Sequence, residues 1–266
     1  MCLIAFAIGA SARWPLLVAA NRDEFLDRPT LPLTRWQSDA DAEIISGRDI
    51  RAGGTWLGLT AAGRIAMLTN VRGPASLTGD KSRGELVTRW LDSDTDAASF
   101  MAQIEPEAYG GFNLVLGDFK SRAWQWLSNK PGPGLESRAL APGIYGLSNG
   151  ALDTPWPKTL GLKKALHSAL TASSEDALEQ ELMTALRDRR RADRKDLPCT
   201  GVPLALEEAL SSAFVDFPEH GYGTRCSTVL VASADSKGWD LAVQEVTHAH
   251  RADDVPGRQK VRLRWS

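Results

Sequence analysis

The most constraining feature of this sequence is a series of short apolar segments that come in pairs, each pair separated by a few turn-forming residues. Residues 3–8 and 16–20 form the first pair, with a glycine and a proline between them. Residues 55–70 repeat the arrangement around a small Ala-Ala-Gly turn. Segments so short and so close predict β-hairpins, because parallel strands need a much longer crossover connection.

Further along, helical and strand-like patterns follow one another in blocks. Residues 82–100 are expected to be helical, with Leu86, Trp90 and Leu91 on one side. Strands are then expected at 112–118 and 122–128, helices at 158–190 and 203–214, and strands at 227–233, 240–246 and 260–265. Blocks of this kind predict an α+β fold of antiparallel sheets with helices packed outside them. No change of composition marks a boundary, so residues 1–266 are expected to form a single domain.

The overall charge and hydropathy exclude several classes of function. The net charge is −2, so nucleic acid is not expected as a partner. The basic run at 187–195 contains Asp188 and Asp193, which favours a solvated helix end over a contact with phosphate or lipid headgroups. No apolar run is long enough to span a bilayer. The apolar start resembles a secretory signal, but no Lys or Arg precedes it.

The cysteine pattern excludes two further classes of protein. Cys2, Cys199 and Cys226 are odd in number and widely spaced, which fits neither a disulfide framework nor a metal site. We therefore expect a reducing compartment, the cytoplasm, and no bound metal.

Cys2 directly follows the initiator methionine, and a residue this small favours removal of Met1. Removal would leave a thiol and a free α-amine on one residue. A thiol attacks only as the thiolate, so it needs a base. The histidines all lie in the second half of the chain, at His167, His220, His248 and His250, and only His220 lies in a glycine-rich, site-like stretch. The α-amine, with a pKa of about 7.7–8.0, can serve as the base itself.

The first hairpin provides a partner for this amine. A turn centred near residues 12 and 13 would place Asp23 opposite Cys2, with Cβ atoms about 4.5–5.5 Å apart. A carboxylate there would hold and orient the ammonium group. A shift of one residue would present Arg22 instead, and the charged Asn-Arg-Asp-Glu segment fits an ordinary strand end equally well.

Acyl chemistry also requires hydrogen-bond donors where the oxyanion develops. Asn70, Asn113 and Asn149 stand at the ends of apolar stretches or beside glycine, and their side-chain amides can donate in this way. Each is equally typical of simple turn chemistry.

Several of these segments, taken in order, resemble the successive motifs of a known family. They are MCLIAFA, AANRDEF, AGGTWLG, LTN, RGELV, GFNL, YGLSNGALDTPWPK and GYGTR, and they run from residue 1 to about 230. The family is the NRDE family, also known as the transport and Golgi organisation protein 2 family. It is similar in turn to the N-terminal nucleophile hydrolases of the choloylglycine hydrolase and penicillin V acylase type.

This resemblance implies a four-layer αββα sandwich of two stacked antiparallel sheets with outer helices. It implies Cys2 as the nucleophile, Asp23 as the aspartate of the Asn-x-Asp motif, and Asn70 and Asn149 as the site asparagines. The chain departs from the acylases at Ala20, where they carry an arginine three residues before the aspartate.

The departure at Ala20 bears on ligand recognition. Arg22 and Arg225 are the arginines that could take over the missing role, and Asn21 belongs to the same motif. Asn21, Arg22 and Arg225 are therefore the expected ligand-binding residues.

Three functions are consistent with these residues: an enzyme, a binding protein and a scaffold. The first is an N-terminal cysteine hydrolase or acyltransferase that acts on a linear amide or thioester and requires no cofactor. The second is a non-catalytic protein that binds haem, a lipid or an acyl thioester on the same fold, with Cys2 or a histidine as a ligand for haem iron. The third is a scaffold in which Cys2 is buried as a small apolar residue.

Overall fold

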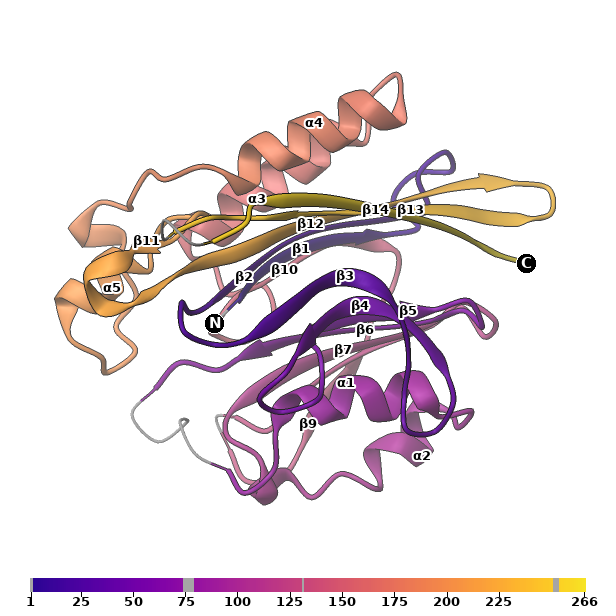
Figure 1. Ribbon diagram of the computed structural model, residues 1–266, viewed down its shortest axis with the longest axis horizontal. Helices are drawn as coiled ribbons and strands as arrows, with labels where there is room; N and C mark the ends of the chain where they lie inside the picture. Colours follow the sequence, from indigo (N-terminus) through magenta and orange to yellow (C-terminus); the bar gives the residue numbers. More distant parts are fainter. Residues whose placement is uncertain (1, 74–78, 131, 251–253) are drawn as a thin grey trace. The chain divides into compact units, whose positions relative to one another are not determined.

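The computed structural model describes residues 2–73, 79–130, 132–250 and 254–266 (Figure 1). The chain forms two compact units, and each is described by itself. The first unit comprises Met1–Asp27, Pro142–Arg264 and Ser266, and the second comprises Arg28–Ala141 and Trp265. The expectation of a single domain stays a prediction.

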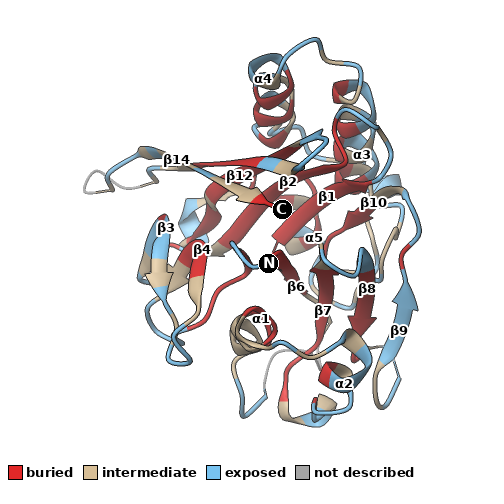
Figure 2. Ribbon diagram, turned by 90° about the vertical axis from the view of Figure 1, so that its right-hand side faces the viewer, coloured by how far each residue is buried: buried red, intermediate tan, exposed pale blue. Residues whose placement is uncertain are grey.

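The first unit contains a sheet in which strands from both ends of the chain pair. Its strand order is β10-β1-β2-β12-β13-β14, with β11 paired to β12. Its strands are β1 (Cys2–Ile8), β2 (Leu16–Phe25), β10 (Gly143–Leu147), β11 (Asp216–Phe217), β12 (Tyr222–Asp235), β13 (Gly238–Thr247) and β14 (Gly257–Trp265). Its helices are α3 (Pro157–Ala169), α4 (Glu175–Leu186) and α5 (Leu204–Ala209). Figure 2 shows that β1 and β2 are buried.

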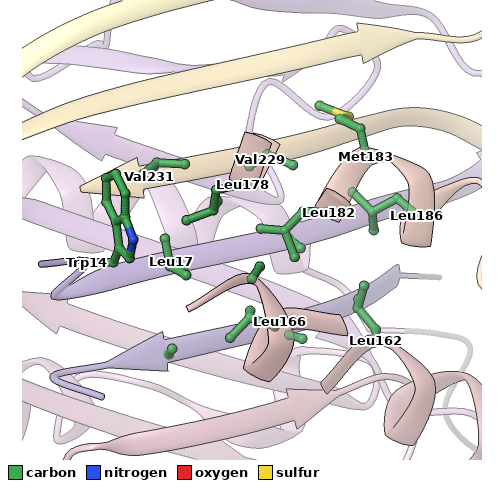
Figure 3. Packing of buried hydrophobic residues seen from close by; sticks show 14 of the residues in the cluster. Trp14, Leu17, Leu162, Leu166, Leu178, Leu182, Met183, Leu186, Val229 and Val231 are labelled. Atoms are coloured by element: carbon green, nitrogen blue, oxygen red, sulfur yellow. The ribbon is translucent and has the colours of Figure 1, made fainter. Parts of the chain in front are cut away.

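The helices α3 and α4 pack on one face of this sheet through an apolar cluster (Figure 3). Alternate β1 residues, Leu3, Ala5 and Ala7, belong to the cluster together with Leu166 of α3 and Leu182 of α4. Side chains alternate between the two faces of a strand, so the odd-numbered β1 residues face the helices. Cys2 therefore lies on the opposite face.

Helix α3 approaches the backbone of β10 closely at Gly146. A Cβ added there would lie 2.5 Å from Thr159 Cγ2 and 2.7 Å from Lys163 Cδ. Glycine at this position lets the helix pack directly on the sheet.

The second unit contains a sheet of strand order β3-β4-β5-β6-β7-β8-β9. Its strands are β3 (Thr30–Gln37), β4 (Glu43–Asp49), β5 (Leu57–Thr60), β6 (Arg64–Asn70), β7 (Phe112–Asp118), β8 (Ala123–Ser128) and β9 (Glu136–Ala139). Its helices are α1 (Arg83–Asp92) and α2 (Ala97–Met101). Trp90 fixes α1 to the sheet, because its Nε1 donates to Ile65 O at 3.1 Å and to Gly117 O at 3.3 Å while the Arg64 guanidinium stacks on its ring.

The predicted hairpins are confirmed, and the predicted helices are present in shorter pieces. The helix expected at 82–100 is interrupted at Ser93, whose backbone is extended, and restarts after Asp96, whose side chain accepts from Ser99 N. The helix expected at 158–190 divides into α3 and α4, with Ser174 as the N-cap of α4. The helix expected at 203–214 is limited to α5.

The strands that the sequence pattern missed include β3, β4, β9 and β10. Every residue of β9 is exposed (Figure 2), and β3 is mostly exposed, so neither shows an apolar run. Both are edge strands, where polar residues are common. Strand β10 lies in a glycine- and proline-rich stretch that resembles a loop.

No helix in the described part of the chain is long and apolar enough to cross a membrane.

Candidate active site at the amino-terminal strand

The register of the first hairpin decides which β2 residue faces Cys2. Cys2 pairs with Arg22, so the expectation that Asp23 lies directly opposite is wrong by one residue. The reason lies at the turn: Gly9 adopts a left-handed conformation with φ of +57° and its N–H donates to Pro15 O at 2.7 Å. This closure makes Ile8 and Leu16 the first pair of the ladder and sets every pair that follows.

Arg22 is the centre of a row of three buried side chains on adjacent strands. It pairs with Cys2 of β1 on one side and with Cys226 of β12 on the other, so all three share one face of the sheet. The three residues are 8%, 4% and 4% exposed in the order Cys2, Arg22, Cys226. Two strand spacings separate the Cα atoms of the cysteines by roughly 10 Å, which is too far for a disulfide.

Burial determines the protonation of both thiols. Burial raises the pKa of Cys2, the amino terminus lowers it, the Asp23 and Glu24 carboxylates raise it, and Arg22 lowers it. Burial together with Glu245, which is hydrogen-bonded to Cys226, raises the pKa of Cys226 well above its ordinary value. Both groups are therefore neutral thiols at neutral pH, and a nucleophilic Cys2 requires a base.

Asn149 lies near Cys2 on the side away from Arg22. Strand β10 pairs with β1 up to the pair Leu147–Ile4, and Ser148 and Asn149 follow at once. Ser148 Oγ lies 3.2 Å from Cys2 O and 3.3 Å from Asn149 Oδ1. Ser148 and Asn149 are both buried. The structure thus brings together Cys2, Arg22 and Asn149 at one end of the sheet.

Asp23 is the next residue of β2 beyond the Cys2–Arg22 pair. Its Oδ1 accepts from Thr224 Oγ1 at 2.7 Å and its main-chain oxygen accepts from the Tyr222 hydroxyl at 2.8 Å. Its carboxylate is buried and acts on its surroundings, raising the pKa values of both Cys2 and Tyr222, for which burial is the larger cause. Asp23 is therefore held rigidly within electrostatic reach of Cys2.

Asn21 points to the helix-covered face of the same sheet. Its Nδ2 donates to Leu186 O and to Ala213 O, both at 2.8 Å, and its Oδ1 accepts from Ser227 Oγ at 2.6 Å. Its assignment to ligand binding stays a prediction, whereas its contacts tie β2 to the end of α4 and to β12.

The same contacts fix the proton positions around Ser227. Since the Asn21 amide nitrogen donates twice, its oxygen takes the Ser227 proton. His248 Nε2, 2.8 Å from Ser227 Oγ, must then be the donor in that contact. His248 therefore cannot activate Ser227 as a base, and this serine–histidine pair is not a nucleophilic pair.

We expect Asn21→Ala to lower the free energy of unfolding by about 2–4 kcal/mol, because two buried carbonyls and one hydroxyl lose their partner. Urea unfolding followed by tryptophan fluorescence measures the change. A loss below about 1 kcal/mol would contradict the structural role of Asn21.

We also expect stability to fall in mild acid because of His248. Burial, with Arg187, His250 and Arg189 nearby, lowers its pKa from 6.5 to about 4. Between these values the unfolded chain binds more protons than the folded one, so stability is lost as the pH falls through this window. His248→Gln should flatten the decline in the urea midpoint between pH 6.5 and 4. An unchanged slope in the variant would show that another group controls it.

The remaining predicted residues lie in different surroundings. Arg225 sits at a β-bulge of β12, and its Nη1 donates to Phe25 O at 2.9 Å and to Leu26 O at 3.2 Å, which holds the end of β2. Asn70 ends β6 of the second unit and is half-buried. Asn113 of β7 is buried, and its side chain contacts Thr69 and Trp126 within that unit's sheet.

Three residues that lie beside the predicted site residues escaped the sequence interpretation: Ser148, Thr224 and Cys226. Ser148 precedes Asn149 directly, so its position beside a predicted site residue was a signal. The contacts of Thr224 and Cys226 with β2 depend on a pairing of distant strands, for which no local pattern exists.

Among the described residues, Glu175, Asp176 and Glu179 on α4 are close enough together to share a metal ion. Lys260 and Arg262 of β14 pair with this acidic group. Glu175 and Glu179 therefore have cationic partners within the unit.

Comparison with known proteins places the chain in a family. Residues 1–245 match the family described as Transport and Golgi organisation 2. The chain belongs to this family. The Transport and Golgi organization protein 2 homolog of Bos taurus is 34% identical over 255 residues, which cover 88% of this chain and 90% of the relative. The Drosophila melanogaster Transport and Golgi organization protein 2 is 29% identical over 258 residues, 89% of each chain.

Solved structures show which fold this Transport and Golgi organisation 2 member adopts. The Caenorhabditis elegans ortholog of N-acylethanolamine-hydrolyzing acid amidase matches with a TM-score of 0.51 at 11% identity, over 86% of this chain and 92% of that chain. The C2A mutant of conjugated bile acid hydrolase from Clostridium perfringens matches with a TM-score of 0.51 at 8% identity, over 98% of this chain and 96% of that chain. These likenesses show the fold alone, and together with the two antiparallel sheets they confirm the predicted α+β fold of the N-terminal nucleophile hydrolase type.

Proposed function

We propose that this chain is an N-terminal cysteine hydrolase or acyltransferase that acts on a linear amide or thioester. The observation that supports this most is the juxtaposition of Cys2, Arg22 and Asn149 at the start of β1. The two solved structures with this fold carry the names of an amidase and of a hydrolase, which is consistent with the same class of chemistry.

The proposed reaction begins once Met1 is removed. The α-amine of Cys2 accepts the thiol proton, and the sulfur attacks the substrate carbonyl carbon. The oxyanion that forms accepts a hydrogen bond from the Asn149 amide. When the intermediate collapses, the carbon–nitrogen bond of an amide, or the carbon–sulfur bond of a thioester, breaks and the leaving group takes the proton from the α-ammonium. The acyl group remains on Cys2 until water or another acceptor attacks it.

The charged neighbours of Cys2 have separate roles in this scheme. Arg22 lowers the pKa of the thiol, which burial raises, and so favours the thiolate. Asp23, held by Thr224 and Tyr222, orients the ammonium group. A second oxyanion contact from Asn70 rests on the family resemblance and stays a prediction.

The α-amine is the expected base because none of the four histidines lies on β1, β2 or β10. His248 donates to Ser227 on the helix-covered side of the sheet, and His250 contacts Thr224 O. His167 lies in α3 and His220 ends a short helical turn.

One observation favours the alternative, a protein that binds haem, a lipid or an acyl thioester without turnover. Burial raises the pKa of Cys2, and with Met1 retained the residue has an amide nitrogen and no base of its own. The identity of the ligand and the cytoplasmic location also remain predictions.

The test combines intact mass with a covalent ester probe. The Cys199→Ser protein, which lacks the exposed thiol, is incubated with p-nitrophenyl acetate. The proposal expects a mass without methionine, one acetyl group on Cys2, and loss of acetylation in Asp23→Ala. An unacetylated Cys2 together with a Soret shift on haem titration would support the binding protein instead.

A further inference from the structure

We infer that Ser148 is a positioning residue that sets the orientation of the Asn149 amide relative to Cys2. This inference rests on the proposed acyl chemistry and adds a residue to it. Ser148 is not expected to touch the substrate, and it acts through its two neighbours.

The geometry places one hydroxyl between two oxygen acceptors. Ser148 Oγ is 3.2 Å from Cys2 O, across the β10–β1 ladder, and 3.3 Å from Asn149 Oδ1. A serine has a single hydroxyl proton, so the two oxygens share it in a three-centre hydrogen bond. Ser148 is 3% exposed and Asn149 fully buried, so water does not compete for this proton.

The hydrogen bond from Ser148 goes to the oxygen end of the Asn149 side chain. The amide oxygen is turned toward the hydroxyl and accepts a hydrogen bond from it. The nitrogen, the end that can donate to an oxyanion, is turned the other way. The same hydroxyl also donates to the main-chain oxygen of Cys2. The nucleophilic residue and its proposed oxyanion donor, Asn149, are therefore both hydrogen-bonded to Ser148.

The contact with Cys2 also lies just where the strand ladder ends. The last β1–β10 pair is Ile4 with Leu147, and beyond it the Ser148 side chain still links the end of β10 to Cys2. Without the hydroxyl, the first residues of β1 and the Asn149 amide lose this link while the ladder itself remains.

The experiment compares two electrophiles that react with the same thiol. p-Nitrophenyl acetate acylates Cys2 through an oxyanion, whereas iodoacetamide alkylates it by displacement without one. Rates are measured for Ser148→Ala, Ser148→Thr, Asn149→Ala and the double variant Ser148→Ala/Asn149→Ala, all in the Cys199→Ser protein.

The expected pattern separates positioning from a purely structural role. Ser148→Ala should slow acylation about 10-fold, less than the roughly 100-fold or greater loss of a direct oxyanion donor, and change alkylation less than twofold. Ser148→Thr, which keeps the hydroxyl, should restore acylation to within about threefold. In the Asn149→Ala protein, Ser148→Ala should add no further loss, because both residues act as a unit.

Other results overturn the inference in distinguishable ways. Equal losses of acylation and alkylation in Ser148→Ala, or full additivity with Asn149→Ala, would show that Ser148 acts on the fold or the thiol instead. Unchanged acylation in Ser148→Ala would remove its role altogether. If the parent protein is alkylated but never acylated, the proposed function itself fails, and this inference with it.

Discussion

We expect Cys2→Ala to lower the rate at which the Cys199→Ser protein reacts with p-nitrophenyl acetate by at least about 10³-fold, because the cysteine that remains, Cys226, is a buried, protonated thiol. The matched control is Cys226→Ala. Cys226 shares the buried face and the same arginine, but burial and Glu245 keep its thiol protonated. Its replacement should leave the rate within about twofold. Release of p-nitrophenol, followed by absorbance, measures both.

The comparison of the two cysteines makes this result decisive. Both are buried and both lie beside Arg22, so a difference between them is due neither to burial nor to this arginine. Substantial acylation that survives in Cys2→Ala, or a rate that falls equally in Cys226→Ala, would exclude Cys2 as the site of the chemistry.

We expect Arg22→Met to raise the pKa of the Cys2 thiol and to slow its alkylation by iodoacetamide at neutral pH by about 10-fold. The guanidinium lowers this pKa by favouring the thiolate, so its removal takes away one of the positive charges that oppose burial and the Asp23 and Glu24 carboxylates. The pH–rate profile should therefore move to higher pH. The measurement is the second-order alkylation rate as a function of pH.

Two further variants serve as controls for this effect. Arg22→Lys keeps the positive charge and should retain part of the shift. Arg225→Met removes an arginine whose guanidinium donates to Phe25 O and Leu26 O, so it should leave the profile in place. A profile that is unchanged in Arg22→Met would show that Arg22 does not act on the thiol.

Short sequence motifs predict which residue types form the candidate site better than they predict how those residues are arranged. Cys2 follows Met1, Arg22 and Asp23 lie in one short motif, and Asn149 precedes a glycine, so the sequence alone identifies these residue types. Which of Arg22 and Asp23 faces Cys2 depends on one residue of register. That register is set by the left-handed Gly9 and its bond to Pro15, which apolar periodicity does not reveal.

The remaining neighbours of Cys2 and Arg22 are brought into place by pairing between strands that are distant in the sequence. Ser148 and Asn149 reach Cys2 only because β10, a strand hidden in a glycine- and proline-rich stretch, pairs with β1. Cys226 reaches Arg22 only because β12 pairs with β2 and a bulge falls at Arg225. The hairpins and helices follow from local patterns, whereas these pairings become visible only in the folded chain.

The most direct test of the account compares the protein with and without its initiator methionine. Both forms are identified by intact mass, and their acylation by p-nitrophenyl acetate is measured from pH 6 to 9. The form that begins at Cys2 should react at least about 100-fold faster, with a rate that follows the titration of an α-amine near its usual pKa of about 7.7–8.0. Equal rates for the two forms would contradict the claim that the amino group of Cys2 activates its own thiol.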